Sequence, residues 1–188
     1  MTHSYPPSLI GLTGYAGSGK DTVADILVQN HGFVKVAFAD PLREMLLTLD
    51  PMVSATANLS KIVNAHGWRL AKKKFPEVRR LMQVFGTDVV RNQIQEDFWV
   101  RALERRIEAL ERVVVADVRF PDEADLILGR GGVMLRVERE GIKKLNHISE
   151  EIDSIPVSGI INNDQDFEHL GKTIDELLLA WQHTICYE

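Results

Sequence analysis

The sequence predicts an α/β fold in which helices cover both faces of a mostly parallel sheet. Short apolar runs, typical of buried strands, alternate with helical segments along most of the chain. Such alternation places helical crossovers between strands, which makes neighbouring strands parallel and covers the sheet on both sides. A glycine-rich loop follows the first apolar run directly. Ligands of this architecture bind beyond the carboxyl ends of the strands, so this loop is where we first expect a site.

The individual elements follow from apolar periodicity and from the positions of proline and glycine. Strands are predicted at 9–13, 33–38, 113–116, 133–137 and 158–161. Helices are predicted at 22–30, 40–49, 60–74, 76–85, 87–95, 98–111 and 121–128, with a closing helix whose apolar stripe runs over 174–185. We expect Asp40 to cap its helix and Gly86 to end the helix that begins at Pro76. Residues 52–58 are expected to form a loop.

The loop after the first strand has the composition of a phosphate-binding loop. It carries glycines that let the backbone turn, so that successive N–H groups point inward at phosphate oxygens, and the following helix adds its positive N-terminal end. Lys20 can reach the β- and γ-phosphates of a nucleotide. An ordinary Gly/Ser turn would not require a lysine at this offset from Gly14 and Gly19. The predicted nucleotide-phosphate site comprises Gly14, Gly17, Ser18, Gly19, Lys20, Asp21 and Thr22.

Acidic residues near this loop are candidate ligands of Mg²⁺. Asp21 takes the place after the lysine that Ser or Thr usually holds, and Thr22 follows it. Its carboxylate could bind the metal, accept a hydrogen bond from a phosphate acceptor, or only favour the helix N-terminus. Asp117 follows a predicted central strand and could hold Mg²⁺ or its waters, while Arg119 could bind a phosphate. Alternatively, these last two residues pair with each other. The predicted metal site comprises Asp21, Thr22 and Asp117.

A second polar patch has the sequence RRLMQVFGTD. Arg79 and Arg80 point to different sides of a helix, so at most one of them faces a ligand. Gln83 shares a face with Arg80 and could bond the edge of a base. Gly86 permits a close backbone approach, and Thr87 offers a hydroxyl. A solvated helix with a glycine C-cap and a threonine N-cap would show the same pattern, so the residues alone leave both interpretations open.

The segment between the second and third predicted strands is too large for a simple crossover and predicts a substrate-binding lobe. We expect a single domain over 1–188, with its core at about 8–40 and 111–185 and this helical insert at about 41–110. Residues 138–154 predict an exposed loop that carries Arg139, Lys143, Lys144 and His147. Phosphoryl transfer uses mobile cations that close over the site, so this loop is either a lid or an ordinary surface loop.

Composition limits the partners and the setting. The formal net charge of −5 argues against a protein that coats nucleic acid, which would carry a basic excess. No apolar run approaches the roughly 20 residues that span a bilayer. The single Cys186 cannot form an internal disulfide, which favours a reduced, intracellular setting. We therefore expect small-molecule nucleotides as partners, without nucleic acid or membrane, and a cytoplasmic location; whether the chain forms a homodimer stays open.

Together and in this order, the motifs resemble those of the bacteriophage deoxynucleoside monophosphate kinases, a branch of the P-loop nucleoside monophosphate kinase fold. The resemblance spans about Leu9 to Asp164 and rests on SGKDT at 18–22, RRLMQ at 79–83, GTD at 86–88, Trp99-Val100, Asp117-x-Arg119 with Glu123, His147-Ile148 with Glu150, and Asn163-Asp164. It implies a P-loop NTPase three-layer sandwich. It also implies transfer of the γ-phosphoryl group of ATP, with Mg²⁺, to a deoxynucleoside monophosphate, in the host cytoplasm if the chain is phage-encoded.

The resemblance further implies roles for single residues. Catalytic roles are implied for Lys20, Asp21 and Arg119, and a contact with ATP for Arg139 on the lid. The implied acceptor-site residues are Leu42, Arg43, Arg80, Gln83, Gly86, Thr87, Trp99, Arg119 and Glu123, with Trp99 near the acceptor base. Residues 52–74 do not align with the family, which leaves the base preference open.

Two other functions remain compatible with the phosphate loop. One is a kinase for another small acceptor, such as dephospho-coenzyme A or a shikimate-like metabolite. The other is a P-loop NTPase that works as a switch or binding module. The combination of Arg80 and Gln83 in the second patch with Trp99 favours an acceptor that carries both a base and a phosphate. Hydrolysis of ATP without any acceptor would instead favour the switch.

Overall fold

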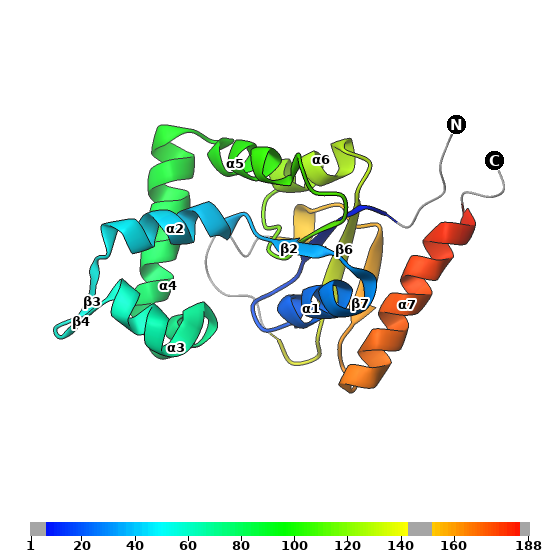
Figure 1. The fold of residues 1–188 in the computed structure, drawn as a ribbon, viewed down its shortest axis with the longest axis horizontal. Helices are drawn as coiled ribbons and strands as arrows, with labels where there is room; N and C mark the ends of the chain where they lie inside the picture. The colour runs from blue at the N-terminus through cyan, green and yellow to red at the C-terminus, as the bar shows by residue number, and fades with distance from the viewer. Residues whose placement is uncertain (1–6, 143–151, 185–188) are drawn as a thin grey trace. The chain divides into compact units, whose positions relative to one another are not determined.

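The computed structural model describes residues 7–142 and 152–184 of the chain. The chain divides into two compact units, residues 1–37 with 104–188, and residues 38–103 (Figure 1). Among the described residues, no helix is both long enough and apolar enough to cross a membrane.

The first unit is built on a five-stranded sheet. Across the sheet the order is β2 (Val34–Val36), β5 (Val113–Val115), β1 (Leu9–Thr13), β6 (Val133–Glu138) and β7 (Gly159–Asn162). Every neighbouring pair of these strands is parallel. The chain passes from one side of β1 to the other between β5 and β6, so the loop after β1 lies at the switch point where open α/β sheets bind ligands. The predicted α/β fold with a mostly parallel sheet is confirmed.

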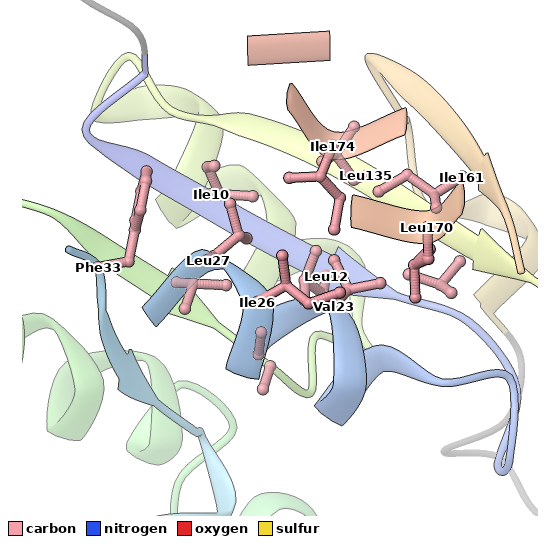
Figure 2. Close-up of a cluster of buried hydrophobic side chains, with 14 of the residues drawn as sticks. Ile10, Leu12, Val23, Ile26, Leu27, Phe33, Leu135, Ile161, Leu170 and Ile174 are labelled. Carbon is pink, nitrogen blue, oxygen red and sulfur yellow. The ribbon is translucent and has the colours of Figure 1, made fainter. Parts of the chain in front are cut away.

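The main core of this unit lies between the sheet and two helices, α1 (Lys20–His31) and α7 (Phe167–Thr184). Figure 2 shows Ile10 and Leu12 of β1 beside the apolar side chains of α1. Both strand residues are fully buried. Burial of one such side chain contributes about 1.5–3 kcal/mol, which fixes β1 and the loop that follows it. The other face of β1 and β6 packs against α6 (Pro121–Gly129), where Ala124 and Ile127 are buried.

The second unit is mainly helical. Its elements are α2 (Ala39–Leu49), the hairpin strands β3 (Met52–Ser54) and β4 (Ala57–Asn58), α3 (Leu59–Lys74), α4 (Pro76–Gln83), the π-helix η1 (Val84–Ile94) and α5 (Phe98–Ile107), which continues past residue 103 into the first unit. The remaining short element, the 3-10 helix η3 (Ile152–Ser154), belongs to the first unit.

The start of α2 and the segment after it differ from the prediction. Asp40 is not the N-cap, because α2 begins at Ala39 and Asp40 lies in its first turn. There its carboxylate accepts a hydrogen bond from Arg43 at 2.7 Å instead of capping the backbone. The predicted loop over 52–58 is in fact the β3–β4 hairpin. The Asp50 side chain closes the base of this hairpin, since it accepts hydrogen bonds from Asn58 and from the backbone N–H of Ser60.

The expected break at Gly86 is also absent. The chain continues from α4 directly into η1, which includes Gly86 and Thr87, so neither residue caps a helix end. The physical reason is tertiary contact. A Cβ on Gly86 would lie 2.9 Å from Leu42 Cδ2, and the Trp99 ring N–H donates to the Gly86 carbonyl oxygen at 2.8 Å. Glycine serves here for close approach. π-helical turns are rare and are frequently found at functional sites.

Candidate functional site

The loop between β1 and α1 requires glycine for both conformation and space. Gly14, Gly17 and Gly19 have φ values of 143°, 90° and 104°, a region that side chains rarely adopt. A Cβ on Gly14 would overlap the carbonyl oxygen of Val137, and a Cβ on Gly19 would overlap the amide nitrogen of Asn163. The backbone therefore passes close to β6 and to the residue after β7. Successive backbone N–H groups in turns of this kind can form an anion-binding nest.

Lys20, the first residue of α1, folds back over this loop. Its ammonium donates hydrogen bonds to the carbonyl oxygens of Gly14 and, at 3.0 Å, Tyr15. The Ser18 N–H donates to the same Tyr15 oxygen at 3.1 Å, which closes a tight turn. A hydrogen bond between two charged groups is stronger than one to a neutral carbonyl. A phosphate bound in the loop would therefore replace the two carbonyl oxygens as the hydrogen-bond partner of the Lys20 ammonium. The lysine is already placed at the predicted phosphate site.

Asp21 follows Lys20, and its carboxylate contacts β2. The Asp21 Oδ1 atom lies 2.8 Å from the ammonium of Lys35, and Asp25 lies 3.0 Å from the same group. Burial alone would lower the pKa of Lys35, but the hydrogen bonds and charges of Asp21 and Asp25 outweigh it and raise the pKa above 10.5. The side chain of Asp21 is 71% exposed, so it stays accessible to a cation at the head of α1.

The loop after β5 is fixed beside the phosphate loop. Its Val118 N–H donates to the Leu12 oxygen of β1 at 3.0 Å, which brings Asp117 and Arg119 to the same edge of the sheet as the phosphate loop. Glu123 is 3% exposed, and its carboxylate accepts the backbone N–H of Arg119 at 2.7 Å. In this structure, Glu123 therefore shapes the turn that presents Arg119.

The residues available for a metal define what kind of cation would fit. Within 7–142 and 152–184, no three His, Cys, Asp or Glu side chains gather as a metal site. Asp21, Asp117 and the Thr22 hydroxyl are oxygen donors from two neighbouring segments of the first unit. This set suits a hard cation that completes its coordination with substrate phosphates and water, as Mg²⁺ does.

In the second unit, the structure brings Leu42, Gly86 and Trp99 together through the contacts described above. Trp99 is 5% exposed, and its ring meets Phe98 edge-on at 4.9 Å between ring centroids. The side chain thus holds the Gly86 carbonyl of η1 in place. Thr87 is buried on the same π-helix, at 6% exposed.

The predicted arginines of this unit are held by acidic neighbours. Arg43 contacts Asp40 at 2.7 Å, while its Nε is buried and has no hydrogen-bond partner in the described part of the chain. Arg80 forms two hydrogen bonds with Glu77, at 2.8 and 2.7 Å. The hydrogen bonds and charge of Arg80 lower the pKa of the Glu77 carboxyl. Gln83, at the end of α4, is half-buried.

The predicted lid lies mostly outside the described residues, since 143–151 are not among them. Lys143, Lys144 and His147 belong to that segment. Arg139 is described, directly after β6, and is exposed.

Two residues to which sequence reasoning assigned no role emerge from the structure. Arg91 of η1 is only 8% exposed, although it begins the polar run RNQ at 91–93, which gives no sign of burial in the sequence. Asn163 donates a side-chain hydrogen bond to the Ser18 oxygen of the phosphate loop at 2.8 Å. Its position directly after the last strand, at the carboxyl edge of the sheet, was the signal that could have indicated it.

Residues 48–174 match the sequence model of the deoxynucleotide monophosphate kinase family. The chain is 32% identical to a protein of Acanthamoeba polyphaga mimivirus provisionally named a deoxynucleotide monophosphate kinase, over 89% of this chain and 91% of that protein. It is 25% identical to the deoxynucleotide monophosphate kinase of Enterobacteria phage T4, over 90% of this chain and 98% of the phage protein.

Solved structures of small-molecule kinases have the same fold. A gluconokinase from Sinorhizobium meliloti 1021 superposes with a TM-score of 0.50 at 12% identity, covering 96% of this chain and 97% of that one. A shikimate kinase from Aquifex aeolicus vf5 gives a TM-score of 0.50 at 13% identity, covering 96% and 99%. At these identities the likeness shows the P-loop kinase fold alone. The family model and the mimivirus relative, which both match most of the chain, show that it belongs to the deoxynucleotide monophosphate kinase family.

Proposed function

We propose that this chain transfers the γ-phosphoryl group of ATP to a deoxynucleoside 5′-monophosphate, which yields the diphosphate and ADP. The observation that carries the proposal is the phosphate loop with Lys20 folded over it, in a chain whose family acts on deoxynucleotide monophosphates. In the reaction, an oxygen of the acceptor phosphate forms a bond to the γ-phosphorus, and the bond from that phosphorus to the bridging oxygen of ADP breaks.

The first unit supplies the groups for ATP. Loop N–H groups and the N-terminus of α1 bind the phosphate oxygens, and Lys20 exchanges its carbonyl contacts for the β- and γ-phosphates. When bound, Mg²⁺ would neutralise phosphate charge, and Asp21, Thr22 and Asp117 are the residues that fit it. Arg139 is proposed to contact ATP from the segment after β6.

For the acceptor, we propose that Arg43, Arg80 and Arg119 neutralise the monophosphate, which otherwise repels ATP. The ion pair of Arg80 with Glu77 is exposed, and exposed ion pairs contribute little to stability. Arg80 can therefore release Glu77 and bind a phosphate at a small cost in free energy. No strong general base is needed, because a phosphate oxygen is already a nucleophile. Catalysis then depends on positioning and on charge stabilisation.

Acceptor-site roles are further proposed for Leu42, Gln83, Gly86, Thr87, Trp99 and Glu123. The contacts of Trp99 with Gly86 support an indirect role, in which the indole fixes η1 near the base. Similarly, the buried Glu123 supports the acceptor contact by setting the backbone of Arg119.

ADP formation from MgATP, measured with dGMP, dTMP, dCMP, dAMP and AMP in turn, tests this proposal. Stimulation by one or more deoxynucleotides is expected, and the Lys20→Met variant should lose it by about 10²–10³-fold, the cost of removing one preorganised charged donor. Circular dichroism of Lys20→Met controls for folding. ADP formation that no monophosphate stimulates would instead favour another acceptor or a switch.

A further inference from the structure

Asn163 joins the end of the sheet to the phosphate loop, 145 residues earlier in the chain. Its backbone N–H donates to the Glu138 oxygen at 2.8 Å, which fixes the residue beside the carboxyl end of β6. Its side-chain amide then donates to the carbonyl oxygen of Ser18 at 2.8 Å. A Cβ on Gly19 would overlap the Asn163 amide nitrogen, so a side chain at this position would displace the amide.

This hydrogen bond determines where one loop N–H group points. The carbonyl of Ser18 and the N–H of Gly19 belong to the same planar trans peptide, so they point in opposite directions. When Asn163 holds the carbonyl, the Gly19 N–H is turned to the other side of the loop. Gly19 is left-handed, at φ 104° and ψ 17°, and a helix follows it, a sequence of conformations that forms an anion-binding nest.

The side chain of Ser18 does not provide an alternative anchor. Its hydroxyl oxygen is buried and has no hydrogen-bond partner in the described part of the chain. The preceding peptide is held by the turn from the Ser18 N–H to the Tyr15 oxygen, at 3.1 Å. The Ser18–Gly19 peptide thus depends on Asn163 for its orientation.

We propose that Asn163 is a positioning residue for phosphoryl transfer, which holds the Gly19 N–H toward the phosphates of the nucleotide. This inference rests on the proposed function of the loop as the ATP site. Asn163 does not touch the reacting atoms in this account. Its effect passes through one peptide of the loop.

The Asn163→Asp variant tests the proposal, because aspartate has the shape of asparagine but lacks the N–H donors of its amide. An ionised carboxylate only accepts hydrogen bonds and would face the Ser18 oxygen without a donor, whereas a protonated carboxyl can donate as the amide does. We expect the affinity for MgATP at about pH 8 to fall about tenfold relative to the native chain, and this deficit to shrink several-fold near pH 4, where an ordinary aspartate is about half protonated. The ratio of the two proteins cancels the titration of Asp164, Glu138 and Glu140, which both contain.

The Asn162→Asp variant is the matched control, with the same change one residue earlier, at an exposed position of β7. It should bind MgATP within about twofold of the native chain at both pH values. Calorimetric titration with MgATP needs no acceptor, so a failure of the monophosphate assay and a failure of this inference are distinguishable. A folded Asn163→Asp with native affinity, or with a deficit independent of pH, would overturn the proposal.

If Asn163→Asp does not fold at neutral pH, Asn163→Ala provides the test. A loss of about tenfold in affinity for MgATP, with the affinity for the monophosphate unchanged, supports the positioning role. Equal affinity for MgATP contradicts it.

Discussion

Replacing Gly14 with alanine tests how tightly the phosphate loop packs against the sheet. Gly14 has a φ of 143°, and a Cβ there would overlap the carbonyl oxygen of Val137 and lie 2.8 Å from Ser18 Oγ. Val137 belongs to β6 and is 1% exposed, within the main core. Its carbonyl cannot move without a shift of the strand, so the strain should lower the free energy of unfolding of the whole unit.

The magnitude follows from two contributions. A side chain in this region of φ costs about 1–3 kcal/mol, and overpacking a filled site costs a further 1–3 kcal/mol or so. Gly14→Ala should therefore lower the free energy of unfolding by about 2–6 kcal/mol. Gly17→Ala is the matched control, since its φ of 90° carries similar strain, but among the residues that the structure describes its Cβ would meet only the flexible end of Ile142, at 3.3 Å. Because the overpacking contribution is absent, its free energy of unfolding should fall by only about 1–3 kcal/mol.

Urea unfolding followed by circular dichroism measures both variants. The two should share one m value, and the midpoint of Gly14→Ala should lie clearly below that of Gly17→Ala. If Gly14→Ala is no less stable than Gly17→Ala, the carbonyl of Val137 does not limit the loop and the reasoning fails.

Two further predictions concern single contacts. Trp99→Phe leaves the Gly86 carbonyl without its buried donor, so the free energy of unfolding in urea should fall by about 1–3 kcal/mol; a neutral effect would show that the indole does not hold η1. The raised pKa of Lys35 means that its pairs with Asp21 and Asp25 stabilise the fold below pH 10.5, and that this contribution is lost as the pH rises through the higher folded-state pKa. Thermal unfolding of the native chain and of Lys35→Met should thus converge at strongly alkaline pH, and parallel curves would contradict the pairing.

The sequence was sufficient for the fold where local pattern and burial agree. Apolar runs such as 113–115 are buried and lie in a parallel sheet, because a run without alternation fits a strand covered on both faces. Glycines and a lysine after the first run predicted the loop for the same reason, since its conformation is encoded in adjacent residues.

Sequence reasoning failed where a distant contact overrides the local signal. A glycine such as Gly86 usually indicates the end of a helix. Here the absence of a side chain allows Leu42 and Trp99 to contact the backbone, and the helix continues. Likewise, the hydrogen bond from Asn163 to Ser18 joins residues far apart in the chain, and the periodicity of apolar residues does not predict it. Roles for single site residues remain predictions, which the variants above address.

The identity of the phosphorylated product tests the central claim most directly. After incubation with MgATP and a deoxynucleoside monophosphate, chromatography with mass detection should find one deoxynucleoside diphosphate for each ADP, and neither with Lys20→Met. ADP that accumulates with free phosphate and without a diphosphate product would contradict the account, because it would mean that the loop hydrolyses ATP and does not transfer its γ-phosphoryl group to a nucleotide.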